Sequence, residues 1–433
     1  MTATEGIFID PQNKVRGEIT VPGDKSISHR AALFGGMAQG DTHITNFLPG
    51  QDCLSTLACL QKLGVTWERH ETEVWLQGQG VDNWVEPQDV LDVGNSGTTF
   101  RLLSGVLAGS PFASTLTGDE SIRKRPMKRV TGPLMQMGAR VLGRQDGNFA
   151  PLTIRGGNLA GRSFTTSVAS AQVKSAILLA GLRANGETIV REPALSRDHT
   201  ERMLRGFGVE VWSEGTQAKV IGGAQLKARD VSVPGDISSA AFFLVLGSLA
   251  KEGELLIREV GVNPTRTGIL EVLQKMGADI QLENISEICG EPRADLRVKP
   301  SDLQGIEIGG DIIPRLIDEV PVIAVAACLA KGETVIRDAS ELRVKESDRI
   351  KTVVEGLKAL GADIEELPDG MRIMGKPKLL GGRAQSHNDH RLAMAWAIAG
   401  LLSENGVSLE GIEAALVSFP GFFPLIEQVT RVL

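Results

Sequence analysis

The hydrophobic pattern of this 433-residue chain repeats one unit roughly every seventy residues. In this unit an apolar helix runs into a glycine, and a short strand follows directly. Its copies read LQKLGVTW, LMQMGARV, LRGFGVEV, LQKMGADI and LKALGADI, with glycines at Gly64, Gly138, Gly208, Gly277 and Gly361. Glycine after the last apolar-periodic residue suits the left-handed C-cap, so each copy predicts a helix end followed by a strand.

A second unit alternates with the first. It is an apolar helix that ends in glycine and passes into a β-branched strand: MAQGDTHIT, VLAGSPFAS, RANGETIV, AKEGELLI, AKGETVI and SENGVSLE, with glycines at Gly40, Gly109, Gly186, Gly253, Gly332 and Gly406. Six copies of this unit and five of the other predict six βα-containing repeats, the last one incomplete. Chance similarity among glycine-rich helix ends is the alternative, and the even spacing argues against it.

The sequence also contains a larger duplication, which includes several of these repeats in each copy. TVPGDKSISHRAALFGGMAQG begins at Thr20, and the similar SVPGDISSAAFFLVLGSLAKEG begins at Ser232. The two V-P-G-D segments are about three of the smaller repeats apart, which predicts two halves of three repeats each. Because Pro-Gly punctuates both segments, we expect the chain to cross between domains there. The predicted domains are 22–234, continuous, and 1–21 plus 235–433, discontinuous.

Each long apolar helix is introduced by a short polar segment. These segments are GDKSISHR, GNSGTTFR, SVASAQVKS, GDISSA, IDEVP and HNDHR, beginning at Gly23, Gly94, Ser167, Gly235, Ile317 and His387. A helix N-terminus offers unpaired N–H groups and a partial positive charge, which favour anions. We therefore expect the six helix starts to converge on one shared, anion-binding cleft.

The composition restricts the possible partners. The net charge is -7, so phosphate or carboxylate binding requires locally concentrated Lys and Arg. The chain is 4% aromatic and contains no Tyr, which argues against nucleic-acid binding by base stacking. No apolar run approaches the ~20 residues that span a membrane, and the N-terminus lacks a signal pattern. We expect a soluble, cytoplasmic protein.

The four cysteines are Cys53, Cys59, Cys289 and Cys328. None has the C-x-x-C spacing of a metal or redox site. We interpret them as buried free thiols in a reducing compartment. The segment HNDHR offers His387 and His390, but no third ligand has persuasive spacing, so no metal is expected.

Three polar segments each allow two readings. In GDKSISHR, Lys25 and Arg30 supply charge for an anion; alternatively, Ser26 merely caps the helix and Arg30 lies at the surface. The run from Arg123 to Arg129 is either a solvated basic loop or a phosphate clamp. If RVKESDRI were helical, Lys345 and Arg349 would share one face beside Glu346; the alternative is a chain of exposed ion pairs.

The ordered set of motifs resembles the EPSP synthase family, in particular its class II branch, over nearly the whole chain. The set comprises PGDKSISHR, GNSGTTFRLL, RKRP, SVASAQVKSA, SRDHT, IDE, RVKESDR and NDHR. The resemblance implies an α/β (α+β) fold: a two-domain inside-out α/β barrel, with three βαβαββ repeats in each domain and the active site in the cleft between them.

The resemblance also implies a reaction. The carboxyvinyl group of phosphoenolpyruvate moves to the 5-hydroxyl of shikimate 3-phosphate, and phosphate leaves after addition and elimination through a tetrahedral ketal phosphate. The implied partners are these two small anions. No cofactor, nucleic acid or membrane is implied, and a monomer is expected.

Site residues follow by position from the resemblance. The phosphoenolpyruvate residues would be Lys25, Gly97, Arg125, Gln172, Arg349 and Arg391. The shikimate 3-phosphate residues would be Ser26, Arg30, Ser170, Ser196, Arg197, Asp318 and Lys345. The catalytic residues would be Lys25, Asp318, Glu346 and His390. Lys25, Asp318 and Glu346 are the candidates for proton transfer, with the acid and base roles left open.

The chain departs from the family pattern at several positions. Many relatives carry Lys where this chain has Val417, so one phosphate contact is missing or supplied elsewhere. Leu102 and Ala171 replace Pro and Ser of other members, and SRDHT replaces a Tyr-containing segment, where Arg197 could take over part of the role. Gly97 is the residue of glyphosate-sensitive members and predicts weak inhibition by glyphosate.

Two other functions compete with this reading. UDP-N-acetylglucosamine enolpyruvyl transferase shares the repeats and one substrate, but it typically uses a loop cysteine, and this chain has none between Cys59 and Cys289. A non-catalytic anion-binding protein of the same fold would not need the paired acid and base groups of Lys25, Asp318 and Glu346.

Overall fold

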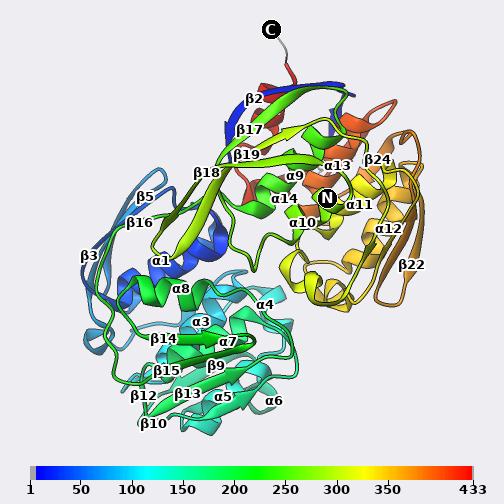
Figure 1. Ribbon diagram of the computed structural model, residues 1–433. Helices are drawn as coiled ribbons and strands as arrows, with labels where there is room; N and C mark the ends of the chain where they lie inside the picture. Colours follow the sequence, from blue (N-terminus) through cyan, green and yellow to red (C-terminus); the bar gives the residue numbers. More distant parts are fainter. Residues whose placement is uncertain (1–5, 432–433) are drawn as a thin grey trace. The chain divides into compact units, whose positions relative to one another are not determined.

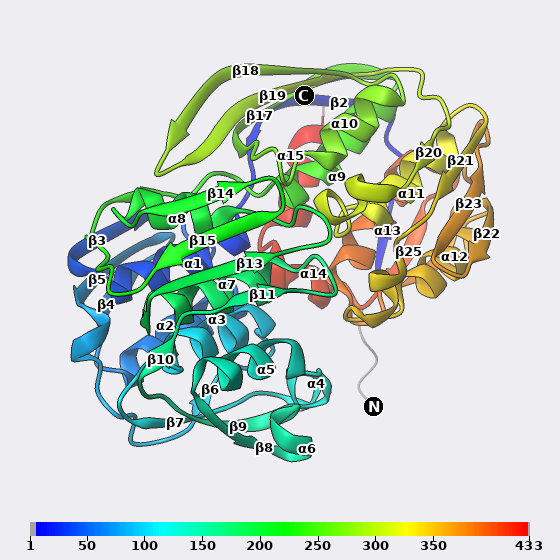
Figure 2. The same ribbon diagram turned by 60° about the horizontal axis from the view of Figure 1, so that its bottom comes forward.

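The computed structural model describes residues 6–431, and these residues form two compact units (Figures 1 and 2). Unit 1 contains the described chain up to Pro22, Gly235–Ser286 and the chain from Pro292 onward. Unit 2 contains Gly23–Pro234 together with Glu287–Glu291, the tip of a long hairpin whose strands begin in unit 1. The chain passes from one unit to the other at the two V-P-G-D segments.

Unit 2 is built from three four-stranded sheets of one topology. In each sheet a parallel pair of strands is extended by an antiparallel hairpin. The orders are β16(Val231–Ser232)-β3(Gln39–Thr45)-β5(Glu73–Gln79)-β4(Thr66–His70), β6(Leu91–Asp92)-β7(Ala113–Thr117)-β9(Phe149–Arg155)-β8(Arg140–Gly143) and β11(Ser163–Thr165)-β13(Glu187–Arg191)-β15(Gln217–Ile221)-β14(Val211–Glu214). A short parallel pair, β10(Leu159–Ala160) and β12(Ala184–Asn185), completes the unit.

Three helices of unit 2 are buried along almost their whole length: α1(Lys25–Met37), α3(Gly97–Leu107) and α7(Ala171–Gly181). They lack a polar face because the sheets surround them, an arrangement visible in Figure 2. The other helices are α2(Gln51–Lys62), α4(Glu120–Lys124), α5(Lys128–Met137), α6(Arg144–Gly147), α8(His199–Gly206) and the 3-10 turn η1(Val81–Asn83). The helices α2, α5 and α8 bury one side, as their amphipathic sequences require.

Unit 1 repeats the same plan. Its sheets are β18(Asp279–Ile288)-β19(Glu291–Lys299)-β17(Glu252–Gly261)-β2(Lys14–Thr20) and β20(Glu307–Ile308)-β21(Glu333–Ile336)-β23(Gly370–Met374)-β22(Asp363–Leu367). The last sheet, β24(Gly382–Gln385)-β25(Val407–Glu410)-β1(Ile7–Ile9), has three strands among the described residues. The sixth repeat is therefore incomplete, as predicted, and β1 supplies its antiparallel strand from the start of the chain.

The central helices of unit 1 are α9(Ile237–Leu249), α11(Val320–Leu329) and α13(His390–Leu402), which contact one another (Figure 1). Each unit has its own hydrophobic core around its three central helices. The remaining elements are α10(Gly268–Lys275), α12(Arg349–Ala359), α14(Glu413–Ser418), α15(Phe422–Thr430), η2(Gly310–Arg315) and η3(Ser340–Val344). Within residues 6–431 no helix has the length and apolar character needed to cross a membrane.

The five C-cap glycines of the first repeated unit adopt the predicted conformation. Gly64, Gly138, Gly208, Gly277 and Gly361 all have positive φ, between 83° and 118°. Each lies between a helix and the strand after it. The predicted change from helix to strand is therefore confirmed at all five places. Glycine occurs there because a residue with a side chain would be strained at positive φ.

Candidate active site

The six polar segments begin the six central helices, as predicted. Four of them carry a side-chain cap in which Asp24, Ser96, Asp236 or Asp389 accepts a hydrogen bond from a backbone N–H of the first turn. These caps fix the helix starts and leave other N–H groups of the first turn unpaired within the helix. Ser26 therefore does not serve as the cap of α1; Asp24 does.

Lys25, the first residue of α1, forms an ion pair with Asp52 of α2, with 2.7 Å between Nζ and Oδ2. Both side chains are partly accessible, at 30% and 18%. The pair holds the ammonium group at the solvent edge of the helix start, where a phosphate could approach it. The sequence reading did not identify Asp52.

Arg30 lies one turn further along α1 and is 2% exposed, so the surface reading of this residue is wrong. Its guanidinium donates from Nε to Thr200 at 2.7 Å, from Nη2 to Ser175 at 2.9 Å and from Nη1 to the carbonyl of Ser26 at 2.9 Å. Burial lowers the pKa of Arg30 to about 10, so it stays charged at neutral pH. The neutral hydroxyls fix its orientation without cancelling its charge.

His29 lies in the core of unit 2 behind the helix starts. Its Nδ1 is 2.7 Å from the Thr56 hydroxyl, which lies 2.7 Å from that of Thr99. Thr99 in turn bonds to Ser96, the cap of α3. Burial lowers the pKa of His29 to about 3, so the ring is neutral at pH 7. This chain of polar groups connects α1, α2 and α3.

A second group of donors surrounds the start of α3. Arg125 donates from Nη2 to Asn95 and Ser121, each at 3.3 Å. Gln172 donates to Thr98 at 2.9 Å and accepts a hydrogen bond from Arg101. A Cβ added to Gly97 would lie 3.1 Å from Arg125 Nη1 and 3.3 Å from Arg101 Nη1. Glycine here lets both guanidinium groups approach the backbone closely.

The basic run divides into two kinds of residue. Arg123, Lys124, Lys128 and Arg129 are exposed, whereas Arg125 is half-buried and directed to Asn95. The solvated-loop reading therefore fits the flanking cations, and only Arg125 joins the polar group at α3.

Ser170 and Ser196 lie on the two loops that precede α7 and α8. The Ser170 N–H and the Ser196 hydroxyl both donate to the carboxylate of Glu192, at 2.9 and 2.8 Å. Arg197 follows Ser196 and is half-buried. Glu192 is a further residue that the sequence reading did not single out.

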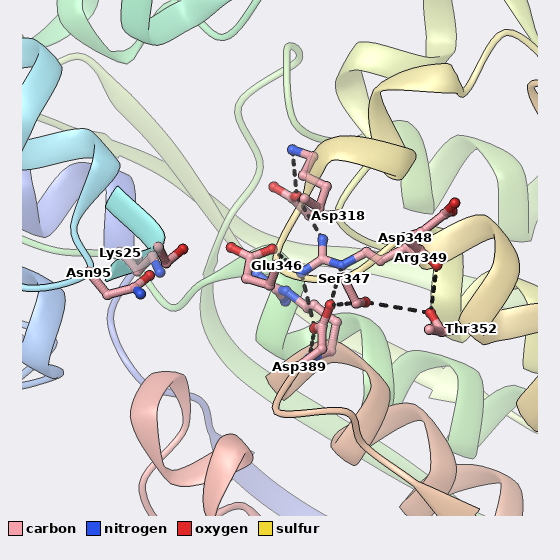
Figure 3. A network of polar contacts seen from close by, with 12 residues as sticks. Lys25, Asn95, Asp318, Glu346, Ser347, Asp348, Arg349, Thr352 and Asp389 are labelled. Atoms are coloured by element: carbon pink, nitrogen blue, oxygen red, sulfur yellow. Dashed lines mark hydrogen bonds and ion pairs between the residues drawn. The ribbon is translucent and has the colours of Figure 1, made fainter. Parts of the chain in front are cut away.

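In unit 1 the polar residues gather around Asp318, directly before α11. Lys345 Nζ and Arg349 Nη1 lie 3.3 and 3.5 Å from the same Oδ1 atom of Asp318. Figure 3 shows Arg349 reaching across to this carboxylate. The helical reading of RVKESDRI is wrong: η3 ends at Val344, Asp348 caps α12, and Arg349 is its first residue. Lys345 and Arg349 meet through Asp318 rather than through a shared helix face.

Arg349 is surrounded by carboxylates and is 1% exposed, so the alternative of exposed ion pairs is also wrong. It donates from Nε and Nη2 to Asp389 at 2.8 and 3.1 Å, and from Nη2 to Glu346 at 2.7 Å (Figure 3). A third of the Glu346 side chain is exposed. Desolvation of the remainder opposes its ionisation, but the positive charge of Arg349, with a smaller contribution from Lys345, holds its pKa well below its usual range. Glu346 is therefore a carboxylate at neutral pH.

Asp389 connects this cluster to α13. Its Oδ1 accepts from the backbone N–H of Arg391 at 2.9 Å, and its Oδ2 accepts from the Ser347 hydroxyl at 3.0 Å. His390 is half-buried at the helix start, and His387 is exposed. Within residues 6–431 the Arg391 side chain makes no hydrogen bond or ion pair, so its guanidinium is available to an anion.

The structure also bears on the cysteines and on metal binding. Cys53, Cys59 and Cys328 are buried free thiols, as predicted, and burial raises the pKa of Cys59 and of Cys328 to about 12. Cys289 is a free thiol but only half-buried, at the hairpin tip, so its predicted burial is wrong. Among the described residues, no group of three or more His, Cys, Asp or Glu side chains could hold a metal ion.

One departure from the family pattern is outside what the structure describes. Val417 belongs to α14, but its side chain is not among the described ones. Leu102 is 1% exposed within the core of unit 2, and Ala171 is the first residue of α7.

Comparisons with known proteins cover nearly the whole chain. The family pattern that matches residues 9–426 is described as EPSP synthase (3-phosphoshikimate 1-carboxyvinyltransferase). A protein of Desulfitobacterium hafniense named 3-phosphoshikimate 1-carboxyvinyltransferase is 71% identical over 428 residues, covering 99% of this chain and 98% of that protein. A Bacillus cereus protein of the same name is 57% identical over 419 residues, which cover 97% of this chain and 98% of that protein.

A solved structure gives the same result for the fold. The EPSP synthase of Acinetobacter baumannii superimposes with a TM-score of 0.90 at 45% identity, covering 98% of this chain and 97% of that one. The predicted fold class is confirmed by this likeness. The names of the similar proteins support neither the sugar-nucleotide alternative nor a non-catalytic protein.

Proposed function

The chain belongs to the EPSP synthase family, and we propose that its two polar clusters divide the family's reaction between them. The enzyme transfers the carboxyvinyl group of phosphoenolpyruvate to the 5-hydroxyl of shikimate 3-phosphate and releases phosphate, a step of aromatic amino acid biosynthesis. The observation that carries the division of roles is the grouping of the two carboxylate candidates for proton transfer, Asp318 and Glu346, around Arg349 in unit 1, and of the phosphate-binding candidates, including Lys25, at the helix starts of unit 2.

In this proposal the phosphate of phosphoenolpyruvate binds at the starts of α1 and α3. Lys25 supplies a point charge, and the backbone at Gly97 supplies N–H donors. Arg125, oriented by Asn95, and Gln172, oriented by Thr98, supply directed hydrogen bonds. Asp52 is the counter-ion that Lys25 exchanges for the substrate phosphate.

The carboxylate of phosphoenolpyruvate is assigned to Arg391 and Arg349. The Arg391 guanidinium has no partner among the described side chains, and its planar fork fits a carboxylate with two parallel hydrogen bonds. Arg349 is already bonded to Asp389 and Glu346. We assign the substrate carboxylate to the position of Glu346 on Nη2.

Shikimate 3-phosphate is assigned to a second set of donors. Arg30 and Ser26 would bind its carboxylate, since Arg30 is rigidly held by uncharged partners. Ser170, Ser196 and Arg197 would bind its phosphate. Asp318 and Lys345, which already contact each other, would bind its ring hydroxyls.

Proton transfer is assigned to the carboxylates near Arg349 and to Lys25. Asp318 lies beside Lys345 and could accept the proton of the 5-hydroxyl. Glu346 is ionised while it contacts Arg349, so it cannot deliver a proton in that state. If the substrate carboxylate replaces it on Arg349, the pKa of Glu346 rises, so Glu346 can take up a proton from water and deliver it to the methylene carbon of phosphoenolpyruvate. His390 lies close enough to Glu346 and Asp389 to lower the pKa of both carboxyls when its ring is protonated.

We further propose that the active site is a cleft between two domains, 22–234 and 1–21 plus 235–433, which close over the substrates and exclude water. The support is that each substrate is assigned residues from both units. Free thiols in the chain favour a reducing, cytoplasmic compartment. A monomer remains our prediction, and sedimentation equilibrium of the purified protein tests it.

Steady-state kinetics with both substrates varied tests the assignment of residues. Arg391→Lys keeps the charge but loses the fork, so it should raise KM for phosphoenolpyruvate roughly tenfold or more and change KM for shikimate 3-phosphate little. Ser26→Ala should do the reverse. If both variants raise both KM values equally, the residue assignment is wrong even though the enzyme is active.

A further inference from the structure

A lysine is buried among acidic residues beneath the loops of Ser170 and Ser196. Lys174, on α7, lies 2.9 Å from Glu192 Oε2 and 2.9 Å from Glu201 Oε1. The three side chains are 2%, 1% and 2% exposed. Nothing in the proposed reaction uses Lys174, Glu192 or Glu201.

The cluster is held together by charge. Burial alone would lower the pKa of Lys174, but Glu201 and Glu192 more than offset this and raise it above its ordinary value. The ammonium group has three N–H donors, and the third lies 3.4 Å from the carbonyl of Ser196. Lys174 is thus fully charged, and each of its donors has an acceptor.

Glu192 differs from Glu201 in what else it contacts. Its Oε1 accepts the backbone N–H of Ser170 at 2.9 Å, and its Oε2 accepts the hydroxyl of Ser196 at 2.8 Å. One carboxylate therefore joins the loop before α7 to the loop before α8. Glu201 is bonded to Lys174, and its second oxygen has no hydrogen-bond partner within the described part of the chain.

We propose that Glu192, neutralised by Lys174, is a positioning residue that sets the spacing of the phosphate donors for shikimate 3-phosphate. The inference rests on the function proposed above, in which Ser170 and Ser196 bind that phosphate. Glu192 does not touch the substrate. It acts through the two serines, which lie on separate loops and have no direct bond to each other among the described contacts.

The contacts also indicate how the subsite responds to the ligand. The single hydrogen of the Ser196 hydroxyl is donated to Glu192, so this hydroxyl must turn to donate to a phosphate dianion. The turn removes the Ser196 bond to Glu192 Oε2, so Glu192 sets the spacing of the two loops before the ligand binds, and its bond from the Ser170 N–H remains afterwards. Lys174 remains on the same oxygen and keeps the buried carboxylate paired, which avoids the cost of an unpaired buried charge.

Glu192→Gln and Glu201→Gln form a matched pair of variants for the test. Both replace a buried carboxylate that lies 2.9 Å from Lys174, but only Glu192 contacts the serines. A glutamine has one carbonyl acceptor and an NH2 donor, so at position 192 it cannot accept from both loops. Steady-state KM values for each substrate and calorimetric binding of shikimate 3-phosphate are measured on both variants.

We expect Glu192→Gln to weaken shikimate 3-phosphate binding roughly tenfold, with KM for phosphoenolpyruvate nearly unchanged. Glu201→Gln should leave both KM values close to those of the wild type. Unchanged binding in Glu192→Gln, or equal losses in the two variants, would overturn the positioning role. If Glu192→Gln does not fold, Glu192→Asp replaces it in the test, because the shorter side chain keeps the charge but withdraws it from the loops. We expect weaker binding of shikimate 3-phosphate and an unchanged KM for phosphoenolpyruvate. Binding as tight as in the wild type would contradict the positioning role.

The wild-type protein separates this inference from the proposed function. If it fails to bind shikimate 3-phosphate in the same calorimetric experiment, the proposed function fails, and the positioning role fails with it. If the wild type binds and Glu192→Gln binds equally well, only the positioning role is wrong.

Discussion

Arg349 donates from Nε to Asp389 Oδ2 at 2.8 Å, and the two side chains are 1% and 0% exposed. Since Asp389 also caps α13 by accepting the backbone N–H of Arg391, this one carboxylate holds the side chain of Arg349 and the backbone from which the Arg391 side chain projects. The start of α12, which begins at Arg349, is thereby tied to the start of α13.

Replacing Asp389 should therefore destabilise unit 1. Asp389→Ala leaves a buried guanidinium short of a partner and removes a helix cap, which should cost about 3–5 kcal/mol of unfolding free energy. Urea unfolding followed by circular dichroism measures this loss. Glu355→Ala is the control: its exposed pair with Lys351 spans 3.9 Å, and its loss should cost less than about 1 kcal/mol. Equal losses in the two variants would contradict the role of Asp389.

A methyl group at position 97 should disturb phosphoenolpyruvate binding selectively. The new Cβ of Gly97→Ala would lie 3.1 Å from Arg125 Nη1, so the guanidinium must shift by a few tenths of an ångström. We expect KM for phosphoenolpyruvate to rise several-fold and KM for shikimate 3-phosphate to stay nearly constant. Gly132→Ala on α5, whose Cβ meets nothing within 4 Å, should change neither. A rise in both KM values for Gly97→Ala would count against the assignment.

Stability should decrease as the pH falls below neutral, in part because of His29. Its pKa in the folded protein is about 3, below the usual value near 6.5, so the unfolded chain takes up the proton first. This contribution to stability is complete above about pH 6.5 and decreases as the pH falls towards 3, by at most about 1.4 kcal/mol per pH unit.

Between pH 7.5 and pH 5 the free energy of unfolding should change mainly through the titration of histidines, because carboxylates with lowered pKa values, such as Glu346, titrate below this range. The free energy of unfolding is measured with denaturant at both pH values. Its decrease from pH 7.5 to pH 5 should be smaller in His29→Gln than in the wild type, by up to about 2 kcal/mol. The exposed His70 provides the control variant, His70→Gln, which should keep the wild-type difference. An unchanged difference in His29→Gln would contradict the pKa of His29.

Glyphosate should inhibit the enzyme weakly and compete with phosphoenolpyruvate. The expectation comes from Gly97 and from the group of cations near it. Initial rates at several phosphoenolpyruvate concentrations test it, and inhibition should lessen as the substrate increases. No inhibition at millimolar glyphosate would show that Gly97 does not confer sensitivity in this chain.

The repeats and the helix starts could be predicted from the sequence because both depend on local signals. A glycine that must adopt positive φ, as at Gly64 and Gly277, marks its helix end within one residue, and a short polar segment such as GDKSISHR or GDISSA marks a helix start. The residues that cap these two helices, Asp24 and Asp236, were not predicted. The helix-end glycine recurs five times and the polar helix start six times, so the architecture could be predicted without any long-range contact.

The polar contacts were harder to predict because the partners are far apart in the sequence. Lys25 and Asp52 are 27 residues apart, Ser170 and Glu192 are 22 apart, and Arg349 and Asp389 are 40 apart. No periodicity relates such positions. The helical reading of RVKESDRI failed for a related reason: charged residues at helical spacing are equally compatible with a loop, and Asp348 as a cap places the helix start at Arg349 instead.

Phosphate release from phosphoenolpyruvate, with shikimate 3-phosphate or UDP-N-acetylglucosamine as the acceptor, tests the central claim most directly. We predict release only with shikimate 3-phosphate, and loss of most of that rate in Lys25→Ala and Glu346→Ala that fold like the wild type. Release only with the sugar nucleotide, or none with either acceptor from folded protein, would contradict the account.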